Sequence, residues 1–365
     1  MPSLDGIRAV CIALVVGAHA AQSMGFPDRW KPIASNVFDG SLGVTVFFVL
    51  SGFLITLLLV TEEGAAGRIS LRAFYARRAL RILPVYAAYV AALVMLDRTT
   101  ALDLNLCDYV TTLTYTKDFG CGQWIDGHLW SLSVEQQFYL LWPLALVGLR
   151  RRGRRWVMAT CIVLAPIWRV VFFRNGWYDL EVYSLMTNAD ALMIGAAAGI
   201  AYFERGAVLQ TLLRFRPALV RGLAVALMWT LMVLGHVVSG AISTVAFSGT
   251  ATALAAAYLI LSYASCPGGP VYAMLNWRPV RYVGALSYSL YIWQQPFFNG
   301  YDSYGYVPTP AVLRFPINVV AAFAVAAVSY HALEMPVLSL RKKFRPMRPQ
   351  DDTPRLEPER STSPL

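Results

Sequence analysis

Long apolar stretches recur along the chain, separated by short polar segments. Ten of them read as membrane spans, at residues 7–24, 41–60, 83–97, 129–148, 156–173, 184–203, 219–236, 246–264, 283–298 and 311–333. Such runs are typical of helices that cross a bilayer, because a helix satisfies its own backbone hydrogen bonds in lipid. The pattern therefore predicts an all-α fold, a polytopic membrane helical bundle of about ten transmembrane helices.

Composition supports this fold, and the distribution of charge orients it. Hydrophobic residues make up 57% of the chain and charged residues only 14%, against about 25% charged in a soluble domain. If the N-terminus is cytoplasmic, 23 of the 31 Lys and Arg residues fall in inner segments and five in outer segments. The positive-inside rule then places both termini in the cytoplasm of a protein of the inner (plasma) membrane. The net charge of +10 is thus explained by topology, without a nucleic-acid partner.

The spans define one membrane domain, residues 1–340, followed by a tail at 341–365. The tail is basic at its start and then rich in proline and charge, which predicts disorder on the cytoplasmic side. Cys107 and Cys121 share the longest outer loop. They would form a disulfide if that side is oxidising, and the sequence leaves open whether they are bonded.

The first span carries ionisable groups on one face. Arg8 and His19 are eleven residues apart, about three helical turns, so both side chains leave the same side, roughly 16 Å apart along the axis. Ionisable groups within a membrane span are costly and usually face a protein interior or a cavity. In the structural alternative, His19 is a packed interior histidine and Arg8 only marks the edge of the membrane.

A basic segment follows the second span. Arg78 and Arg81 are three residues apart, so they share a helical face, and two guanidiniums at this spacing suit a phosphate. A basic helix that only sets the membrane topology is the alternative.

Further polar groups lie within the later spans. Glu135 sits about 9 Å below the outer end of the fourth span, where a carboxylate needs a partner or a proton. A protonated structural glutamate is its alternative role. Arg169 and Asp190 are predicted to pair with each other, and Gln294 lies near the outer end of the ninth span.

These groups fall into two predicted layers along the membrane normal. His19, Glu135 and Asp190 lie in the outer half, with Arg169 and Gln294 near the same level. A second layer, formed by Arg8, Arg78 and Arg81, lies at the cytoplasmic edge. This arrangement suits a long donor that carries phosphates at one end and a reactive group at the other.

Five motifs in order resemble acyltransferase family 3, the integral-membrane O-acyltransferases that include O-antigen and exopolysaccharide acetylases and macrolide acyltransferases. The motifs are Arg8 followed by His19 after ten residues, VLSGFLIT at 49–56, YARRALRILP at 75–84, WSLSVEQQFY at 130–139 and SYSLYIW at 287–293. The resemblance covers about residues 4–340. It departs from the family at 293–296, where WQQP stands in place of a histidine-containing motif, and in the absence of a C-terminal hydrolase-like domain from this sequence.

The resemblance implies transfer of an acyl group, by default acetyl, from acyl-CoA to a hydroxyl of a carbohydrate acceptor such as a cell-envelope polysaccharide. By position, His19 matches the family's essential histidine, Arg8 its arginine partner and Glu135 the glutamate of the fourth span. Arg78 and Arg81 match the pair implicated with the CoA donor. We expect no bound cofactor and no metal, with acetyl-CoA as co-substrate. O-acylation of a glycosylated secondary metabolite is an alternative acceptor.

Imidazole suits the role of general base, because its ordinary pKa lies near working pH. Glu135 would orient His19 if spans one and four are neighbours. A function of another class, a proton-coupled transporter or flippase, would use the same ionisable groups as a proton relay. That class predicts internal pseudo-symmetry and interrupted helix pairs, and the sequence shows neither.

Overall fold

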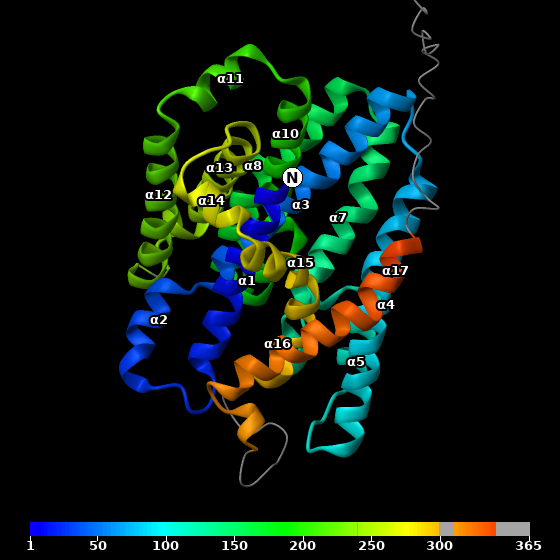
Figure 1. The fold of residues 1–365 in the computed structure, drawn as a ribbon, viewed down its shortest axis with the longest axis vertical. Helices are drawn as coiled ribbons and strands as arrows, with labels where there is room; N and C mark the ends of the chain where they lie inside the picture. The colour runs from blue at the N-terminus through cyan, green and yellow to red at the C-terminus, as the bar shows by residue number, and fades with distance from the viewer. Residues whose placement is uncertain (239, 299–309, 341–365) are drawn as a thin grey trace, which may run out of the picture.

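The computed structural model describes residues 1–238, 240–298 and 310–340, and all regular elements in these ranges are helices (Figure 1). The predicted all-α class is confirmed, and each of the ten expected spans falls on a helix. These helices are α1 (Pro2–Gln22), α3 (Gly40–Ala66), α4 (Leu71–Thr99), α7 (Leu129–Gly148), α8 (Arg151–Arg174), α10 (Leu185–Glu204), α12 (Pro217–Val237), α13 (Ile242–Ser265), α15 (Arg278–Trp293) and α16 (Ile317–Ser329). The predicted tail, 341–365, lies outside the described residues.

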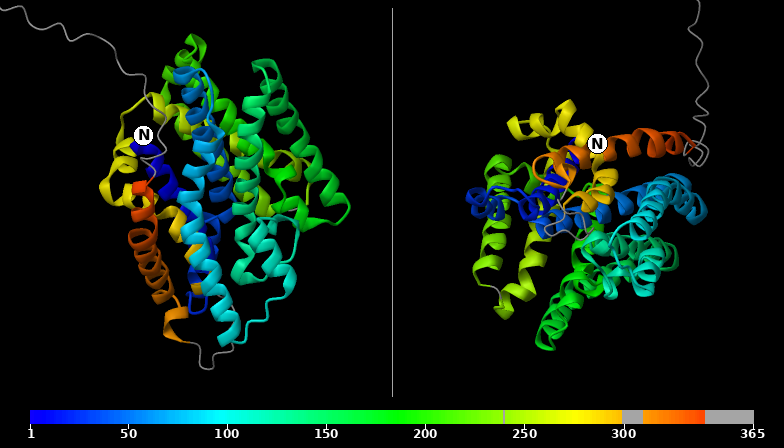
Figure 2. Two further views of the ribbon diagram at one scale, coloured as in Figure 1. Left: turned by 90° about the vertical axis from the view of Figure 1, so that its right-hand side faces the viewer. Right: turned by 90° about the horizontal axis from the view of Figure 1, so that it is seen from below.

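Shorter helices connect the long ones. They are η1 (Asp28–Trp30), α2 (Lys31–Val37), α5 (Leu106–Thr114), η2 (Lys117–Phe119), α6 (Trp124–Gly127), α9 (Tyr178–Tyr183), α11 (Ala207–Arg214), α14 (Pro270–Asn276), η3 (Gln295–Phe297), η4 (Ala311–Leu313), the π-helix η5 (Tyr330–Glu334) and α17 (Met335–Leu340). The long helices run roughly along one axis, and the connections gather at its two ends (Figure 2).

Within the described residues, eight helical segments are long and apolar enough to cross a membrane. Two of the ten expected spans do not meet this criterion. Helix α7 carries Glu135 and several other polar residues, and α15 has only 16 residues. Both helices nevertheless contribute polar side chains to the site described below.

The basic segment and the third span form one continuous helix rather than two elements. Ser70 caps the start of α4 by accepting a hydrogen bond from the backbone N–H of Ala73, and the helix continues through Pro84. Nearby, Glu62 of α3 accepts hydrogen bonds from the backbone N–H of Ser70, at 2.9 Å, and from buried Arg77, at 3.1 Å. These contacts fix the first turns of α4 against α3.

Helices α3 and α10 touch backbone to backbone. A Cβ atom added at Gly52 would lie 2.0 Å from the carbonyl oxygen of Leu192, and one at Gly195 would lie 2.0 Å from that of Val49. Small residues permit this approach. The contact holds the central helix α3 in place, so that Ser51, beside Gly52, faces α7.

The two ends of the bundle are distinguished by the chain itself. One, called the N-terminal end, carries the start of α1 and the turn between α3 and α4 (Figure 1). The other, called the disulfide end, carries α2, α5 and the loop closed by the bond between Cys107 and Cys121, which the sequence had left open. Lys117 is buried in this loop and pairs with Asp108, at 3.3 Å, and with Asp126.

The predicted pair of Arg169 and Asp190 is confirmed. One guanidinium nitrogen of Arg169 lies 2.7 and 2.8 Å from the two carboxylate oxygens, and another donates to the hydroxyl of Thr250 at 3.1 Å. The three residues join α8, α10 and α13 inside the bundle. Neither residue lines any of the three pockets described below.

Candidate active site

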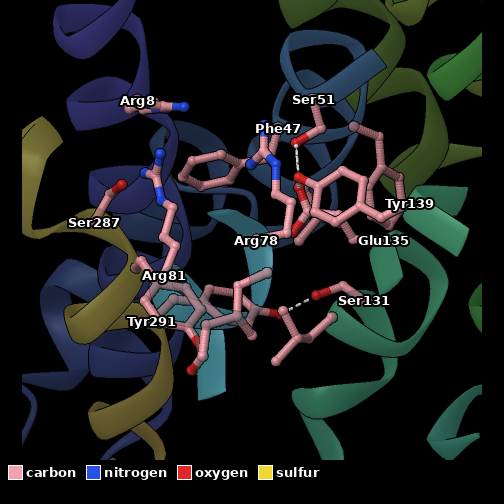
Figure 3. Close-up of a pocket in the computed structure, with 15 residues that line it drawn as sticks. Arg8, Phe47, Ser51, Arg78, Arg81, Ser131, Glu135, Tyr139, Ser287 and Tyr291 are labelled. Carbon is pink, nitrogen blue, oxygen red and sulfur yellow. Dashed lines mark hydrogen bonds between the residues drawn. The ribbon is translucent and has the colours of Figure 1, made fainter. Parts of the chain in front are cut away.

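A pocket between α1, α3, α4, α7 and α15, called the arginine pocket, contains three of the expected site arginines (Figure 3). It has a volume of about 100 Å³. Its polar lining residues are Arg8, Ser51, Arg78, Arg81, Ser131, Glu135, Tyr139, Ser287, Tyr288 and Tyr291. The pocket therefore combines arginine side chains from α1 and α4 with hydroxyl groups from α3, α7 and α15.

The helical spacing of α4 decides which arginines face the pocket. Arg77 turns away to pair with Glu62, whereas Arg78 and Arg81 line the pocket. The guanidinium of Arg78 lies over the ring of Tyr139, 4.9 Å from its centroid. Within the described part of the chain, neither Arg78 nor Arg81 makes a hydrogen bond through its side chain, so both guanidiniums keep donors for an anion.

The charges in the pocket favour an anionic ligand. Arg8 is partly neutralised by Asp5, whose carboxylate lies 3.3 Å from its guanidinium. Glu135 is the acidic residue among the lining side chains, against three arginines. The sequence-predicted grouping of Arg8 with Arg78 and Arg81 is what the structure shows.

Glu135 is held by two hydroxyl groups. Tyr139, one turn further along α7, donates a hydrogen bond to its carboxylate at 2.5 Å, and Ser51 of α3 donates another to the same oxygen. Figure 3 shows the three side chains converging on the pocket wall opposite Arg8. Ser51 and Tyr139 were not among the predicted site residues, although the four-residue spacing of Glu135 and Tyr139 on one helix face was a usable signal.

His19 lies towards the disulfide end, where two larger cavities open. The first, of about 540 Å³, is bordered by α2, and the second, of about 550 Å³, by the disulfide loop. His19, His128, Trp130 and Tyr183 line both. The Nδ1 atom of His19 is 3.3 Å from the amide oxygen Oε1 of fully buried Gln294, and its ring meets the edge of Trp124.

The expected pairing of Glu135 with His19 is not what the structure shows. The hydrogen-bond partners of Glu135 are Ser51 and Tyr139, and the partner of His19 is Gln294. Glu135 therefore belongs with the arginines instead of the histidine layer. The reason is the position of α7. Glu135 lies where this helix faces α3 and α4 across the arginine pocket. His128, two turns earlier, bonds to the backbone of α15 and lines the cavities that contain His19.

The arginine pocket and the α2 cavity share two lining residues, Val44 and Tyr291. The hydroxyl of Tyr291 donates to the backbone carbonyl of His128 at 2.8 Å and also contacts the hydroxyl of Ser131. Arginines thus lie on one side of this tyrosine and His19 on the other. In the described residues, no group of three or more His, Cys, Asp or Glu side chains could hold a metal ion.

A helical bundle in which an arginine-lined pocket and a histidine-lined cavity share lining residues is consistent with a multi-pass membrane enzyme. The family model of the acyltransferase domain, acyltransferase family 3, matches residues 1–331, so the chain belongs to this family. This finding disfavours the transporter alternative.

Among curated proteins, the chain is 25% identical to the peptidoglycan O-acetyltransferase OatA of Listeria monocytogenes, over 92% of the chain and 56% of that protein. It is 26% identical to the O-acetyltransferase OatA of Staphylococcus aureus, over 94% of the chain and 57% of that protein. The chain therefore spans little more than half the length of these relatives. No solved structure matches it.

Proposed function

We propose that this acyltransferase moves an acetyl group from acetyl-CoA to a hydroxyl of a cell-envelope polysaccharide. The observation that carries the proposal is the junction at Val44 and Tyr291, where the arginine pocket meets a cavity lined by His19. A donor with phosphates at one end and a thioester at the other fits this order of groups. The names of the two OatA relatives support acetyl transfer, and that of the Listeria protein supports a cell-wall glycan as acceptor.

On the donor side, Arg78 and Arg81 bind the phosphates of CoA, with Arg8 beside them. Guanidinium groups bind phosphate oxygens through paired, charge-assisted hydrogen bonds. The N-terminal end then faces the cytoplasm, where the positive-inside rule also places it. Glu135, held by Ser51 and Tyr139, offsets part of the positive charge of the arginines.

On the acceptor side, His19 acts as the general base. The amide oxygen of Gln294 can only accept a hydrogen bond, so Nδ1 of His19 carries the proton and Nε2 keeps a free lone pair. Nε2 takes the proton of the acceptor hydroxyl as the oxygen attacks the thioester carbonyl carbon. The carbon–sulfur bond breaks, the new ester forms, and the imidazolium returns its proton to the departing CoA thiolate.

The test needs no acceptor. Purified protein in detergent is compared for acetyl-CoA binding and for slow thioester hydrolysis between the wild type, His19→Ala and the double variant Arg78→Ala, Arg81→Ala. We expect saturable binding by the wild type, loss of binding in the double variant, and retained binding without hydrolysis in His19→Ala.

Absence of saturable acetyl-CoA binding by the folded wild type would overturn the donor assignment. Hydrolysis that survives in His19→Ala would instead remove His19 from the role of base. The two results are independent, because binding and hydrolysis are measured separately.

A further inference from the structure

His128 is a second histidine held firmly beside the same cavities as His19. It occupies the N-cap position of α7, and only 6% of its surface is exposed. Its ring lies between Tyr89 and Tyr291, with centroid distances of 5.7 and 5.5 Å. Together with His19 it lines both cavities at the disulfide end. The reaction proposed above gives this residue no role.

The hydrogen bonds of His128 determine which of its nitrogens is free. Nε2 lies 3.2 Å from the backbone carbonyl oxygen of Ile292. A carbonyl oxygen only accepts, so Nε2 carries the proton and Nδ1 of the neutral ring keeps a lone pair. Nδ1 is buried and has no hydrogen-bond partner in the described parts of the chain. A buried polar atom without a partner is costly and uncommon in folded proteins, which indicates a ligand that completes it.

We propose that Nδ1 of His128 accepts a hydrogen bond from a second hydroxyl of the acyl acceptor and thereby positions a sugar for reaction at His19. This inference rests on the proposed function. The ligand must present a hydrogen-bond donor to Nδ1 while another of its hydroxyls reaches His19. A sugar ring, with several hydroxyls on one rigid frame, meets both requirements.

Aromatic side chains of the same cavities support a sugar ligand. Trp130 and Tyr183, whose ring centroids are 4.9 Å apart, line both cavities, and Trp124 lines the one beside the disulfide loop. Ligand pockets typically combine such aromatic surfaces with a few placed polar groups. Here the polar lining side chains include His19 and His128, together with Asp39 in one cavity and Asp179 in the other.

Two substitutions separate positioning from a purely structural role. The amide of the shorter side chain in His128→Asn reaches the place of Nδ1 and can accept there. The amide of the longer side chain in His128→Gln reaches the place of Nε2, so it can donate to Ile292 but leaves no acceptor at Nδ1. His331→Gln is the matched control, because His331 bonds to Tyr282 at 3.1 Å and lines none of these cavities.

The assay measures acetyl transfer from acetyl-CoA to two probe acceptors. Chitotriose offers many hydroxyls, whereas cyclohexanol offers one. We expect His128→Gln to lower the ratio of kcat/KM for chitotriose over cyclohexanol by about tenfold, mainly through a higher KM for chitotriose. His128→Asn should keep the ratio within about threefold of the wild type, and His331→Gln should leave it unchanged.

Melting temperatures establish that each variant is folded. If His128→Asn does not fold, His128→Gln alone decides, because it keeps the bond to Ile292. The inference is overturned if folded His128→Gln keeps the wild-type ratio of kcat/KM for chitotriose over cyclohexanol. It is also overturned if folded His128→Asn lowers this ratio as much as His128→Gln was expected to. If the wild type hydrolyses acetyl-CoA but transfers nothing to chitotriose, this inference alone falls. If it neither binds nor hydrolyses acetyl-CoA, the proposed function falls as well.

Discussion

Arg81 gives the sharpest single-residue test of the donor pocket. Its side chain lines the pocket and forms no hydrogen bond or ion pair with any described residue, whereas Arg78 is packed over Tyr139 and Phe74. Arg81→Gln should therefore remove a phosphate contact and leave the packing of α4 unchanged. Arg78→Gln would change ligand binding and packing together.

The magnitude follows from the kind of contact. A hydrogen bond to a charged group contributes about 1.5–3 kcal/mol. Since about 1.4 kcal/mol corresponds to a tenfold change in an equilibrium constant, the Kd for acetyl-CoA should rise roughly 10- to 150-fold in Arg81→Gln. Arg81→Lys keeps the charge but loses the planar fork, so its Kd should lie between those of the wild type and Arg81→Gln.

The assay is equilibrium binding of acetyl-CoA to purified protein in detergent, at one fixed salt concentration. Arg72→Gln is the control, because Arg72 lies on the same helix but is exposed and outside the pocket. It should change the Kd less than about twofold, since it removes only a distant, screened charge. The reasoning is refuted if Arg81→Gln binds as tightly as the wild type, or if Arg72→Gln weakens binding equally.

Three further predictions concern stability, each measured by thermal unfolding in detergent. Gly195→Leu should abolish folding or sharply lower Tm, because a Cβ would meet the carbonyl of Val49, whereas Gly222→Leu, where a Cβ meets open space, should not. Asp190→Leu should cost about 3–5 kcal/mol by leaving Arg169 buried without its partner, and the added change Arg169→Leu should recover most of this loss. Burial raises the pKa of Asp118, which accepts a hydrogen bond from Gln137 at 2.8 Å and lies in the loop closed by the Cys107–Cys121 disulfide. The folded protein thus binds the proton of the Asp118 carboxyl more tightly than the unfolded chain does. Protonated Asp118 makes its full contribution to the free energy of unfolding below the unfolded pKa of about 3.9, and this contribution is lost as pH rises through the folded pKa. Asp118→Asn should remove this loss of stability with rising pH. An identical dependence of Tm on pH in the wild type and the variant would contradict the prediction.

The features that the sequence predicted correctly depend on spacing along one helix or on composition. Arg8 and His19 share a face of α1, and Arg78 and Arg81 share a face of α4, because helical periodicity fixes both relations. The close contact of α3 and α10 was also predictable, since Gly52 and Gly195 lie in apolar helices where small residues favour packing.

The partners across helices were not predictable in the same way. Depth along the membrane normal placed Glu135 near His19, but depth does not say which helices are neighbours. The relation of His19 to Gln294, 275 residues later, depends on how α15 packs beside α1. The contact of Ser51 with Glu135 was not predictable from the sequence, because it requires α7 to lie opposite α3.

The arrangement of charge explains why the carboxylate and the base lie apart. A carboxylate behind His19 would add a buried charge where no arginine is in hydrogen-bond contact, and burying an unpaired charge is costly. Gln294 fixes the tautomer of His19 without adding charge. Glu135 instead lies in the arginine pocket, where three guanidiniums compensate it. Gln294→Glu should therefore destabilise the protein, whereas Gln294→Leu should keep the fold but slow turnover by releasing the orientation of His19. Equal Tm values for Gln294→Glu and the wild type would show that charge, after all, does not decide the arrangement.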